Sequence, residues 1–166
     1  PKDLKSLEKL IDRGKKDLKP IACLIEKGAI FRKKEKKEKV SINSDILRQQ
    51  AIKCLLNSIK KDTKIISTTG YTSRELYQIR KIHNIKYGKD FYVTGGMGHS
   101  SMISLGVALN TKKQVICLDG DGSALMHLSS LRSIGLFGKS NFKHILFNNA
   151  VHESVGGQKT FSEKLQ

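Results

Sequence analysis

The sequence predicts an α/β fold in which a parallel β-sheet carries helices on both faces. Short apolar stretches that suit buried strands alternate along the chain with longer stretches whose apolar residues recur at helical spacing. In addition, glycine-rich and polar clusters fall where the strands are expected to end, which is where open α/β sheets bind ligands. The expected strands are 64–67, 91–93, 114–118 and 144–147, and the helices that alternate with them are 72–83, 98–109 and 123–136.

The N-terminal part is expected to belong to a different domain. Residues 4–18 have apolar side chains at helical spacing, Pro20 would end that helix, and residues 21–25 form an apolar run typical of a buried strand. One helix and one strand cannot bury themselves alone, so we interpret residues 1–30 as the end of a preceding domain. Residues 31–43 include eight consecutive charged residues and predict an exposed linker rather than an anion-binding arm.

The second domain is then expected to cover residues 44–166. Ser44 can cap a helix with one apolar face, and Thr72 with Glu75 has the spacing of a capping box at the start of the next helix. The apolar face of the first of these helices is expected to consist of Ile46, Leu47, Ala51, Cys54, Leu55 and Ile59.

Composition indicates a soluble globular protein. The net charge of +16 would suit nucleic acid, but the excess is scattered lysine and aromatic residues make up only 6%; we therefore expect a solvated surface and no nucleic-acid partner. No apolar stretch approaches the about 18 residues of a membrane helix. The first residues show neither a start methionine nor a signal-peptide pattern, so we expect part of a cytoplasmic protein.

The three cysteines predict no metal site and no disulfide framework. Cys23, Cys54 and Cys117 have apolar neighbours and lack CxxC spacing. We expect all three to be reduced core residues.

Four polar clusters follow the expected strands and predict an anion-binding site. Strand ends that lead into helices expose backbone N–H groups, and glycines let a phosphate approach the main chain closely. The clusters are residues 68–70, 95–101, 119–123 and 148–153.

The last two clusters together predict a metal site. Asp121 lies between two glycines, and 25 residues separate Gly122 from Asn148. Because that interval fits one helix plus one strand, a right-handed crossover would bring Asn149 beside Asp121. A carboxylate, a side-chain amide and a main-chain carbonyl are hard oxygen ligands that suit Mg²⁺ shared with a diphosphate.

A dinucleotide-binding loop is the competing interpretation of the second cluster. Residues 96–101 form a loose GxGxxG pattern with serine in the last position, and Asp119 ends the next strand, where a ribose-binding acid could lie. This interpretation leaves Asp121 and the asparagine pair unexplained, and we therefore regard it as the weaker alternative.

The triplet Gly120–Gly122, followed at this interval by two asparagines, is the signature of the thiamine-diphosphate enzymes, and the chain is identified as a member of that family. Within it, the sequence resembles the phosphonopyruvate decarboxylases, with the sulfopyruvate decarboxylases as close relatives. Segments 67–70, 73–76 and 148–158 carry this likeness. The resemblance covers the whole chain, from the end of the pyrimidine-binding domain through most of the diphosphate-binding domain.

The resemblance implies roles for the polar clusters. Asp121 and Asn149 would be side-chain ligands of Mg²⁺, and Val151 would contribute its carbonyl oxygen. Gly122 and Ser123 would contact the diphosphate.

The glycine-rich loop would bind the rest of the cofactor. The carbonyl of Gly95 would accept the exocyclic amine, and Met97 would support the bent form of the cofactor, although ordinary core packing is the alternative for a methionine. Gly96, Gly98 and Gly120 are expected to be cofactor-binding as well.

Further residues are candidates for contacts with the substrate. His152 and Glu153 would be general acid–base groups, against the alternative of helix-start capping and packing. Thr69 and Gly70 are candidates for substrate or interface contacts, and Arg74 is expected at the surface or at an interface.

The resemblance also implies an activity. The chain would belong to a thiamine-diphosphate- and Mg²⁺-dependent decarboxylase of a small anionic 2-oxo acid, converting phosphonopyruvate to phosphonoacetaldehyde and carbon dioxide. The alternatives are the beta subunit of a sulfopyruvate decarboxylase, a more distant acetolactate-synthase-like enzyme, and a non-catalytic diphosphate- or nucleic-acid-binding module.

The expected enzyme is incomplete within this chain. The glutamate that activates the cofactor belongs to the pyrimidine-binding domain, and the last elements of the diphosphate domain would lie beyond Gln166. We therefore expect a homo-oligomer or a partner chain to supply the pyrimidine-binding domain.

Overall fold

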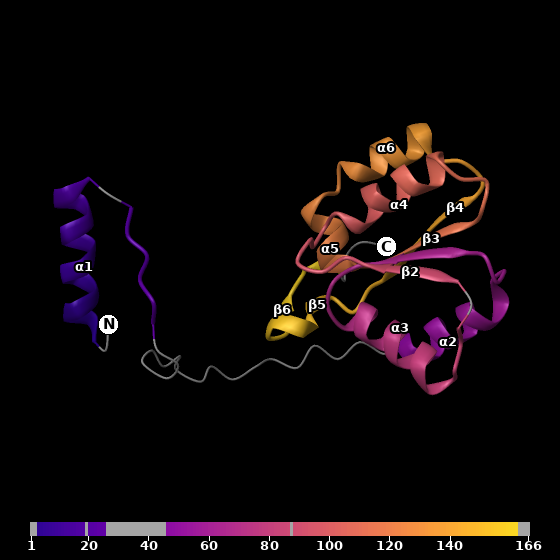
Figure 1. Cartoon of the computed structure of the whole chain (residues 1–166), viewed down its shortest axis with the longest axis horizontal. Helices are drawn as coiled ribbons and strands as arrows, with labels where there is room; N and C mark the ends of the chain where they lie inside the picture. The colour runs from indigo at the N-terminus through magenta and orange to yellow at the C-terminus, as the bar shows by residue number, and fades with distance from the viewer. Residues whose placement is uncertain (1–2, 19, 26–45, 87, 163–166) are drawn as a thin grey trace. The chain divides into compact units, whose positions relative to one another are not determined.

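The computed structural model describes residues 3–18, 20–25, 46–86 and 88–162. Contacts within the chain divide it into two units, Pro1–Lys39 and Val40–Gln166 (Figure 1). The predicted linker and the predicted cap Ser44 lie outside the described residues.

The first unit contains helix α1 (Leu4–Asp17), as the sequence predicts. The Asp3 carboxylate caps it by accepting the N–H of Ser6 at 2.7 Å. The strand predicted at 21–25 is wrong, because these residues are irregular and mostly exposed, and Cys23 is only half-buried. A strand needs a neighbour that pairs with its backbone groups, and no strand lies in the described part of this unit.

The second unit is built on a four-stranded parallel sheet in the order β2-β1-β3-β4. Its strands are β1 (Lys64–Ser67), β2 (Lys89–Tyr92), β3 (Val115–Gly120) and β4 (Phe142–Phe147). The central strand β3 is buried along most of its length, which explains its apolar sequence. The predicted parallel sheet is confirmed.

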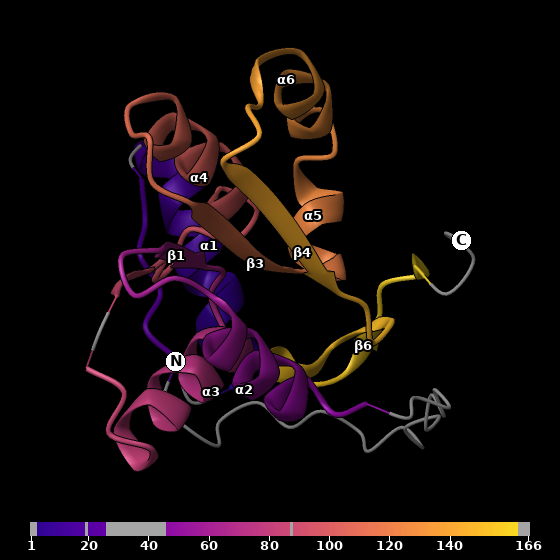
Figure 2. The ribbon, with the colours of Figure 1, turned by 90° about the vertical axis from the view of Figure 1, so that its right-hand side faces the viewer.

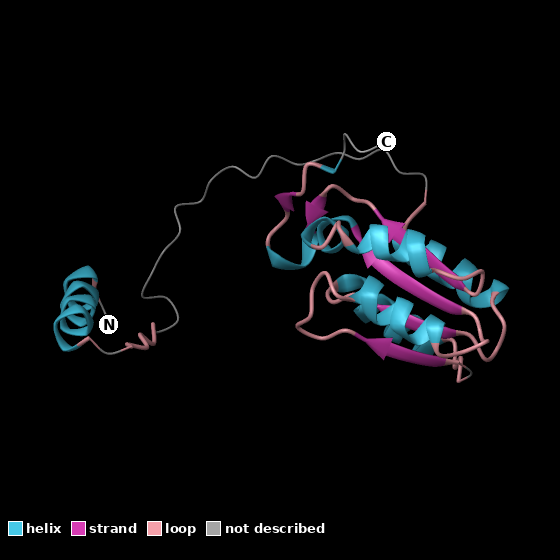
Figure 3. Ribbon diagram, turned by 90° about the horizontal axis from the view of Figure 1, so that it is seen from above, coloured by secondary structure: helices cyan, strands magenta, loops and turns pink. Residues whose placement is uncertain are grey.

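Helices cover both faces of this sheet (Figures 2 and 3). Helices α2 (Arg48–Ser58) and α3 (Tyr71–Ile82) pack on one face, and α4 (Ser100–Leu109) and α6 (Ser130–Phe137) pack on the other. Successive residues of a strand point to opposite faces. Ile65 therefore contributes to the core under α2 and α3, while Ile66 contributes to the core under α4.

Helix α2 turns only part of the predicted face to the core, since Leu55 and Ile59 pack against it and other predicted residues do not. Ile46 and Leu47 precede the helix and are 64% and 66% exposed, and Cys54 is also exposed. The buried residues are instead Ile52 and Leu56, one turn apart on the helix. Cys54 is therefore not a core residue, although all three cysteines are free thiols as predicted.

Two predicted helix starts also differ from the structure. The capping box is wrong because α3 begins at Tyr71, with Gly70 as its N-cap at a φ of 94°, and Thr72 lies inside the helix. The predicted helix 123–136 is two helices, α5 (Asp121–Met126) and α6, separated by the turn 127–129.

The chain changes its direction of winding between β1 and β3. Strand β1 leads through α3 to β2 on one side, and β3 leads through α5 and α6 to β4 on the other. The ligand crevice of an open parallel sheet lies outside the carboxyl ends of two such strands. The crevice is therefore expected beside Thr68, which follows β1, and Asp121, which follows β3.

A small hairpin that was not predicted follows β4. It pairs β5 (Val151–His152) with β6 (Gln158–Lys159) in antiparallel fashion around the 3₁₀ helix η1 (Glu153–Val155). The hairpin brings the residues after β6 back toward the end of β3.

Candidate cofactor and metal site

A pocket of about 260 Å³ lies at the carboxyl ends of β1 and β3. Loops after β1, β3 and β4 and the loop before α4 contribute its walls. The predicted residues Gly95, Gly96 and Gly98 do not line this pocket. The predicted site residues that line the pocket are Thr69, Gly70, Met97, Gly120, Asp121, Gly122, Ser123, Asn149, Val151, His152 and Glu153.

Asp121 is the first residue of α5, and only 4% of it is exposed. Its Oδ2 atom accepts hydrogen bonds from the hydroxyls of Thr160 and Ser162, the latter at 2.7 Å. Within the described residues no hydrogen bond reaches Oδ1, so this oxygen is open to a cation. Sequence reasoning missed Thr160 and Ser162, because single hydroxyl residues beyond an unpredicted hairpin carry no pattern.

Two asparagine side chains shape the loop after β4. The Oδ1 of Asn148 accepts the N–H of Ala150 at 3.0 Å, and the Oδ1 of Asn149 accepts the N–H of Val151 at 3.3 Å, as in Asx turns. The Asn149 amide also donates to Glu153 Oε2 at 3.2 Å. The Asn149 Oδ1 atom retains a second lone pair that can bind a metal ion.

These oxygen atoms fit a magnesium ion. The Asp121 carboxylate, the Asn149 amide oxygen and the Val151 carbonyl are hard donors, and all three residues line one pocket. Mg²⁺ usually completes its coordination with water and phosphate oxygens, and the backbone of Gly120 and Gly122 would admit a phosphate. Metal binding by these residues stays a prediction.

Ser123 joins three of the loops around the pocket. Its Oγ accepts a hydrogen bond from the Thr68 hydroxyl at 2.9 Å and another from the Gly98 N–H at 3.0 Å. The Ser123 side chain also helps to hold the pKa of Asp119, the residue before the glycine turn, below its ordinary value. Thr68 and Ser123 are each only 3% exposed, so these bonds are shielded from water.

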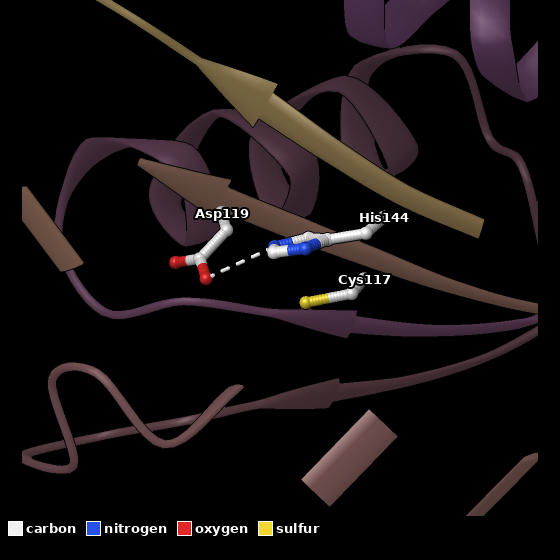
Figure 4. A group of neighbouring side chains, drawn as sticks. All are labelled: Cys117, Asp119 and His144. Carbon is white, nitrogen blue, oxygen red and sulfur yellow. Dashed lines mark hydrogen bonds and ion pairs between the residues drawn. The ribbon is translucent and has the colours of Figure 1, made fainter. Parts of the chain in front are cut away.

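Cys117 and Asp119 of β3 gather with His144 of β4 (Figure 4), and their potential ligand atoms all lie within 4.8 Å of one another. His144 Nε2 is 3.2 Å from Asp119 Oδ2. Burial raises the pKa of Asp119, but hydrogen bonds from His144 and Ser123 outweigh it and keep the pKa below its ordinary value. Burial lowers the pKa of His144, but Asp119 and Cys117 raise it to about 9. At neutral pH the pair is therefore an imidazolium and a carboxylate.

Two of the predicted cofactor-binding glycines pack against histidine rings. A Cβ atom at Gly122 would collide with the ring of His152, and one at Gly98 would collide with the ring of His127. His127 was missed by sequence reasoning and packs against His99, with 4.5 Å between ring centroids. A side chain at Gly98 would also be strained by the φ of 87° there, whereas one at Gly122 would require the His152 ring to move.

Arg48 also lines the pocket and was missed by sequence reasoning. Its Nε and Nη2 atoms donate to both carboxylate oxygens of Glu75, at 2.8 and 2.7 Å. Its Nη1 and Nη2 atoms each donate to Glu153 Oε2 at 3.1 Å. The partners lie 27 and 105 residues away in the sequence, so local spacing gave no signal. An acid–base role for Glu153 would require its carboxylate to leave Arg48.

A parallel sheet with a glycine turn, a buried carboxylate and an asparagine loop at its switch point defines a phosphate-binding α/β domain. Residues 68–165 match the family "Thiamine pyrophosphate enzyme, C-terminal TPP binding domain". The chain belongs to this family, and the fold and the family inferred from the sequence are confirmed. No helix in the described part of the chain is long and apolar enough to cross a membrane.

Curated relatives of this chain are decarboxylases by name. The chain is 43% identical over 117 residues to "Phosphonopyruvate decarboxylase" of Streptomyces viridochromogenes, covering 69% of this chain and 28% of that protein. It is 38% identical over 117 residues to "Sulfopyruvate decarboxylase subunit beta" of Methanocaldococcus jannaschii, covering 70% of this chain and 60% of that protein. The matches thus span less than two thirds of the length of these relatives.

Proposed function

We propose that this chain is the diphosphate- and Mg²⁺-binding part of a thiamine-diphosphate-dependent decarboxylase of 2-oxo acids. The observation that carries the proposal is that Asp121, Asn149 and Val151 line one pocket beside the glycine turn. These three residues would hold Mg²⁺, and the backbone of Gly120 and Gly122 would face the diphosphate. The family of the chain and the names of its relatives support this proposal.

The proposal includes a division of the chain into domains. Residues 1–30 would end a pyrimidine-binding domain, residues 31–43 would be a linker, and residues 44–166 would form the diphosphate-binding domain. A second copy or a partner chain would supply the activating glutamate. The name of one relative, a "subunit beta", supports a partner chain.

Thiamine diphosphate, when bound, supplies the carbon nucleophile and the electron sink for the loss of carbon dioxide. The residues of this chain would position it: the Gly95 carbonyl would accept its amine, and Met97, which lines the pocket, would support its bent form. His152 packs against Gly122, and its ring nitrogens would move a proton near the diphosphate end of the site.

We propose phosphonopyruvate as the substrate, giving phosphonoacetaldehyde and carbon dioxide. Sulfopyruvate is the second candidate, because relatives of either name have similar identities of 43% and 38%. Both substrates carry an anionic head group. Thr69 and Gly70 at the start of α3 line the pocket together with Arg74, which makes no ion pair among the described residues. Backbone N–H groups and a guanidinium there would attract a phosphonate or a sulfonate.

The test is a decarboxylation assay of the full-length protein, with its partner chain where one is required, in thiamine diphosphate and Mg²⁺. Phosphonopyruvate, sulfopyruvate and pyruvate should be compared, and phosphonopyruvate should react fastest. Fastest turnover of sulfopyruvate would favour the second candidate instead. Bound cofactor without turnover of any of the three would refute the substrate assignment.

A matched pair of carboxylate variants tests the metal site. Asp121→Asn should weaken Mg²⁺-dependent cofactor binding by at least about 10- to 100-fold, because it removes the charge of a proposed ligand. Asp62→Asn should leave binding unchanged, because this side chain is 53% exposed and contacts Lys113 at 3.6 Å. Equal binding by both variants would refute the assignment of Asp121.

A further inference from the structure

Thr160 and Ser162, which have no role in the sequence-based prediction, reach the carboxylate of Asp121 from the segment after β6. The Thr160 hydroxyl donates to Asp121 Oδ2, and Ser162 Oγ lies 2.7 Å from the same oxygen. Asp121 is 4% exposed and Ser162 is 1% exposed, so water does not compete for these bonds. One oxygen of the proposed metal ligand is therefore engaged by the protein itself.

The hairpin of β5 and β6 brings the two hydroxyls back toward the end of β3. Just beyond the hairpin, the Thr160 N–H donates to the Ala150 carbonyl at 2.9 Å. The Asn148 amide donates to the Ser162 carbonyl at 3.2 Å, and Asn148 Oδ1 lies 2.7 Å from Ser162 Oγ. Main-chain and side-chain bonds thus fix this segment to the loop after β4.

The two hydroxyls divide the Asp121 carboxylate into unlike halves. Each carboxylate oxygen has two lone pairs, and Thr160 and Ser162 supply two protons to Oδ2. The single Ser162 proton also faces Asn148 Oδ1, but the charged carboxylate is the stronger acceptor. Within the described residues no hydrogen bond reaches Asp121 Oδ1. One oxygen is therefore saturated, and the other keeps its lone pairs for a cation.

A carboxylate that offers one oxygen in a fixed position discriminates between cations. Mg²⁺ takes about six ligands in a strict octahedron, whereas Ca²⁺ takes about six to eight in a flexible geometry and can bind both oxygens of a carboxylate. Asp121, held as described, suits the smaller ion better. The hydroxyls behind it would prevent the rotation that brings both oxygens to one ion.

We propose that Thr160 and Ser162 are positioning residues that hold Asp121 as a one-oxygen ligand and thereby select Mg²⁺ over Ca²⁺ at the proposed cofactor site. The proposal rests on the proposed function, because it concerns the same metal site. It assigns metal selectivity to two residues that do not line the pocket. Metal ligands are commonly oriented in this way by hydrogen bonds from residues behind them.

A purely structural role is the alternative, in which the two hydroxyls only anchor the hairpin to the rest of the unit. Their loss would then lower stability and weaken cofactor binding to the same degree with either ion. The ratio of the affinities in Mg²⁺ and Ca²⁺ therefore separates the two interpretations.

The test is the affinity of the full-length protein, with its partner chain where one is required, for thiamine diphosphate in Mg²⁺ and separately in Ca²⁺, measured by calorimetry. The wild type should bind more tightly in Mg²⁺. Thr160→Val removes the hydroxyl but keeps the shape of the side chain, and it should weaken binding by at least about 10-fold in Mg²⁺ and by less than about 3-fold in Ca²⁺. Ser162→Ala should shift the ratio in the same direction.

Two further variants are matched controls. Thr160→Ser keeps the hydroxyl and should retain the affinities and the ratio of the wild type. Thr111→Val makes the same substitution at the opposite end of the sheet, where the Thr111 hydroxyl accepts the Lys113 N–H at 3.2 Å, and it should leave both affinities unchanged. Circular dichroism verifies folding, and Ser162→Ala decides the question if Thr160→Val does not fold.

Three results would overturn the proposal. They are equal losses of affinity in Mg²⁺ and Ca²⁺, unchanged affinities in Thr160→Val and Ser162→Ala, and a wild type that does not prefer Mg²⁺. A wild type that binds no cofactor in either ion would instead refute the proposed function itself, which distinguishes the two failures.

Discussion

Replacing Arg48 with alanine should destabilise the second unit by about 3 kcal/mol, mainly through the loss of its partner Glu75. The two side chains are only 17% and 13% exposed and are joined by two hydrogen bonds. Removing one member of a buried pair costs about 3–5 kcal/mol, whereas exposed pairs contribute about 0–1 kcal/mol. The Arg48–Glu75 pair is mostly but not fully buried, so the loss of this pair should cost about 2–3 kcal/mol.

The second partner of Arg48 should contribute less. Glu153 is 48% exposed, and both of its bonds to Arg48 involve the same oxygen atom at 3.1 Å. Solvent screens such a pair, so its share should stay below about 1 kcal/mol. Arg48 therefore joins α2 to α3 strongly and to the 3₁₀ helix η1 weakly.

Urea unfolding followed by circular dichroism measures these terms. Double-mutant cycles of Arg48→Ala with Glu75→Ala and with Glu153→Ala should give coupling energies of about 2 kcal/mol and under about 1 kcal/mol. Arg48→Lys should recover only part of the loss, because an ammonium cannot bind both oxygens of Glu75 in parallel. The exposed Arg132→Ala is the control and should change stability by less than about 0.5 kcal/mol. A coupling to Glu153 that equals the coupling to Glu75 would refute the reasoning.

Two further predictions concern stability. Gly122→Ala should lower the free energy of unfolding by about 1–3 kcal/mol because its Cβ would overlap the ring of His152, whereas Gly106→Ala, which has open space around it on α4, should raise it by about 0.5–1 kcal/mol. Thermal melts compare the two, and equal effects would contradict the prediction. The pKa of His144 in the folded protein is about 9, above its ordinary 6.5. Protonated His144 therefore contributes its full stabilisation below pH 6.5, and this contribution to the free energy of unfolding is lost as the pH rises through 9. The stability advantage of the wild type over His144→Gln should therefore fall by about 2–3 kcal/mol across this range in urea unfolding, and a constant difference would contradict it.

The two central strands, β1 and β3, were predictable because they are buried on both faces. The bounds of β1 were predicted as they are found, and β3 was recognised from the apolar run that begins at Val115. Such runs reflect burial directly and need no knowledge of the partner strand. The interval between Gly122 and Asn148 fits one right-handed crossover, so the meeting of Asp121 and Asn149 at one pocket was also predictable.

Helix faces and helix ends were less predictable. Ile46 and Leu47 fit a helical period that the chain does not continue, since α2 begins only at Arg48. Thr72 and Glu75 have the right spacing for a capping box, but tertiary contacts decide otherwise. Thr72 is buried and Glu75 bonds to Arg48, so neither side chain serves the helix start. Packing and long-range ion pairs override local sequence patterns of this kind.

The availability of individual atoms at the site was not predictable at all. The end of a strand determines that Ser123 reaches the pocket, but the use of its hydroxyl depends on Thr68 and Gly98, which two other segments supply. Both lone pairs of its Oγ atom are then occupied, and only the hydroxyl proton is left for a ligand. The backbone N–H of Ser123 can also donate to a diphosphate, and Ser123→Ala retains it. Cofactor affinity lost in that variant would consequently report the hydroxyl, through its hydrogen bonds to the two loops or through its proton, and not the backbone contact.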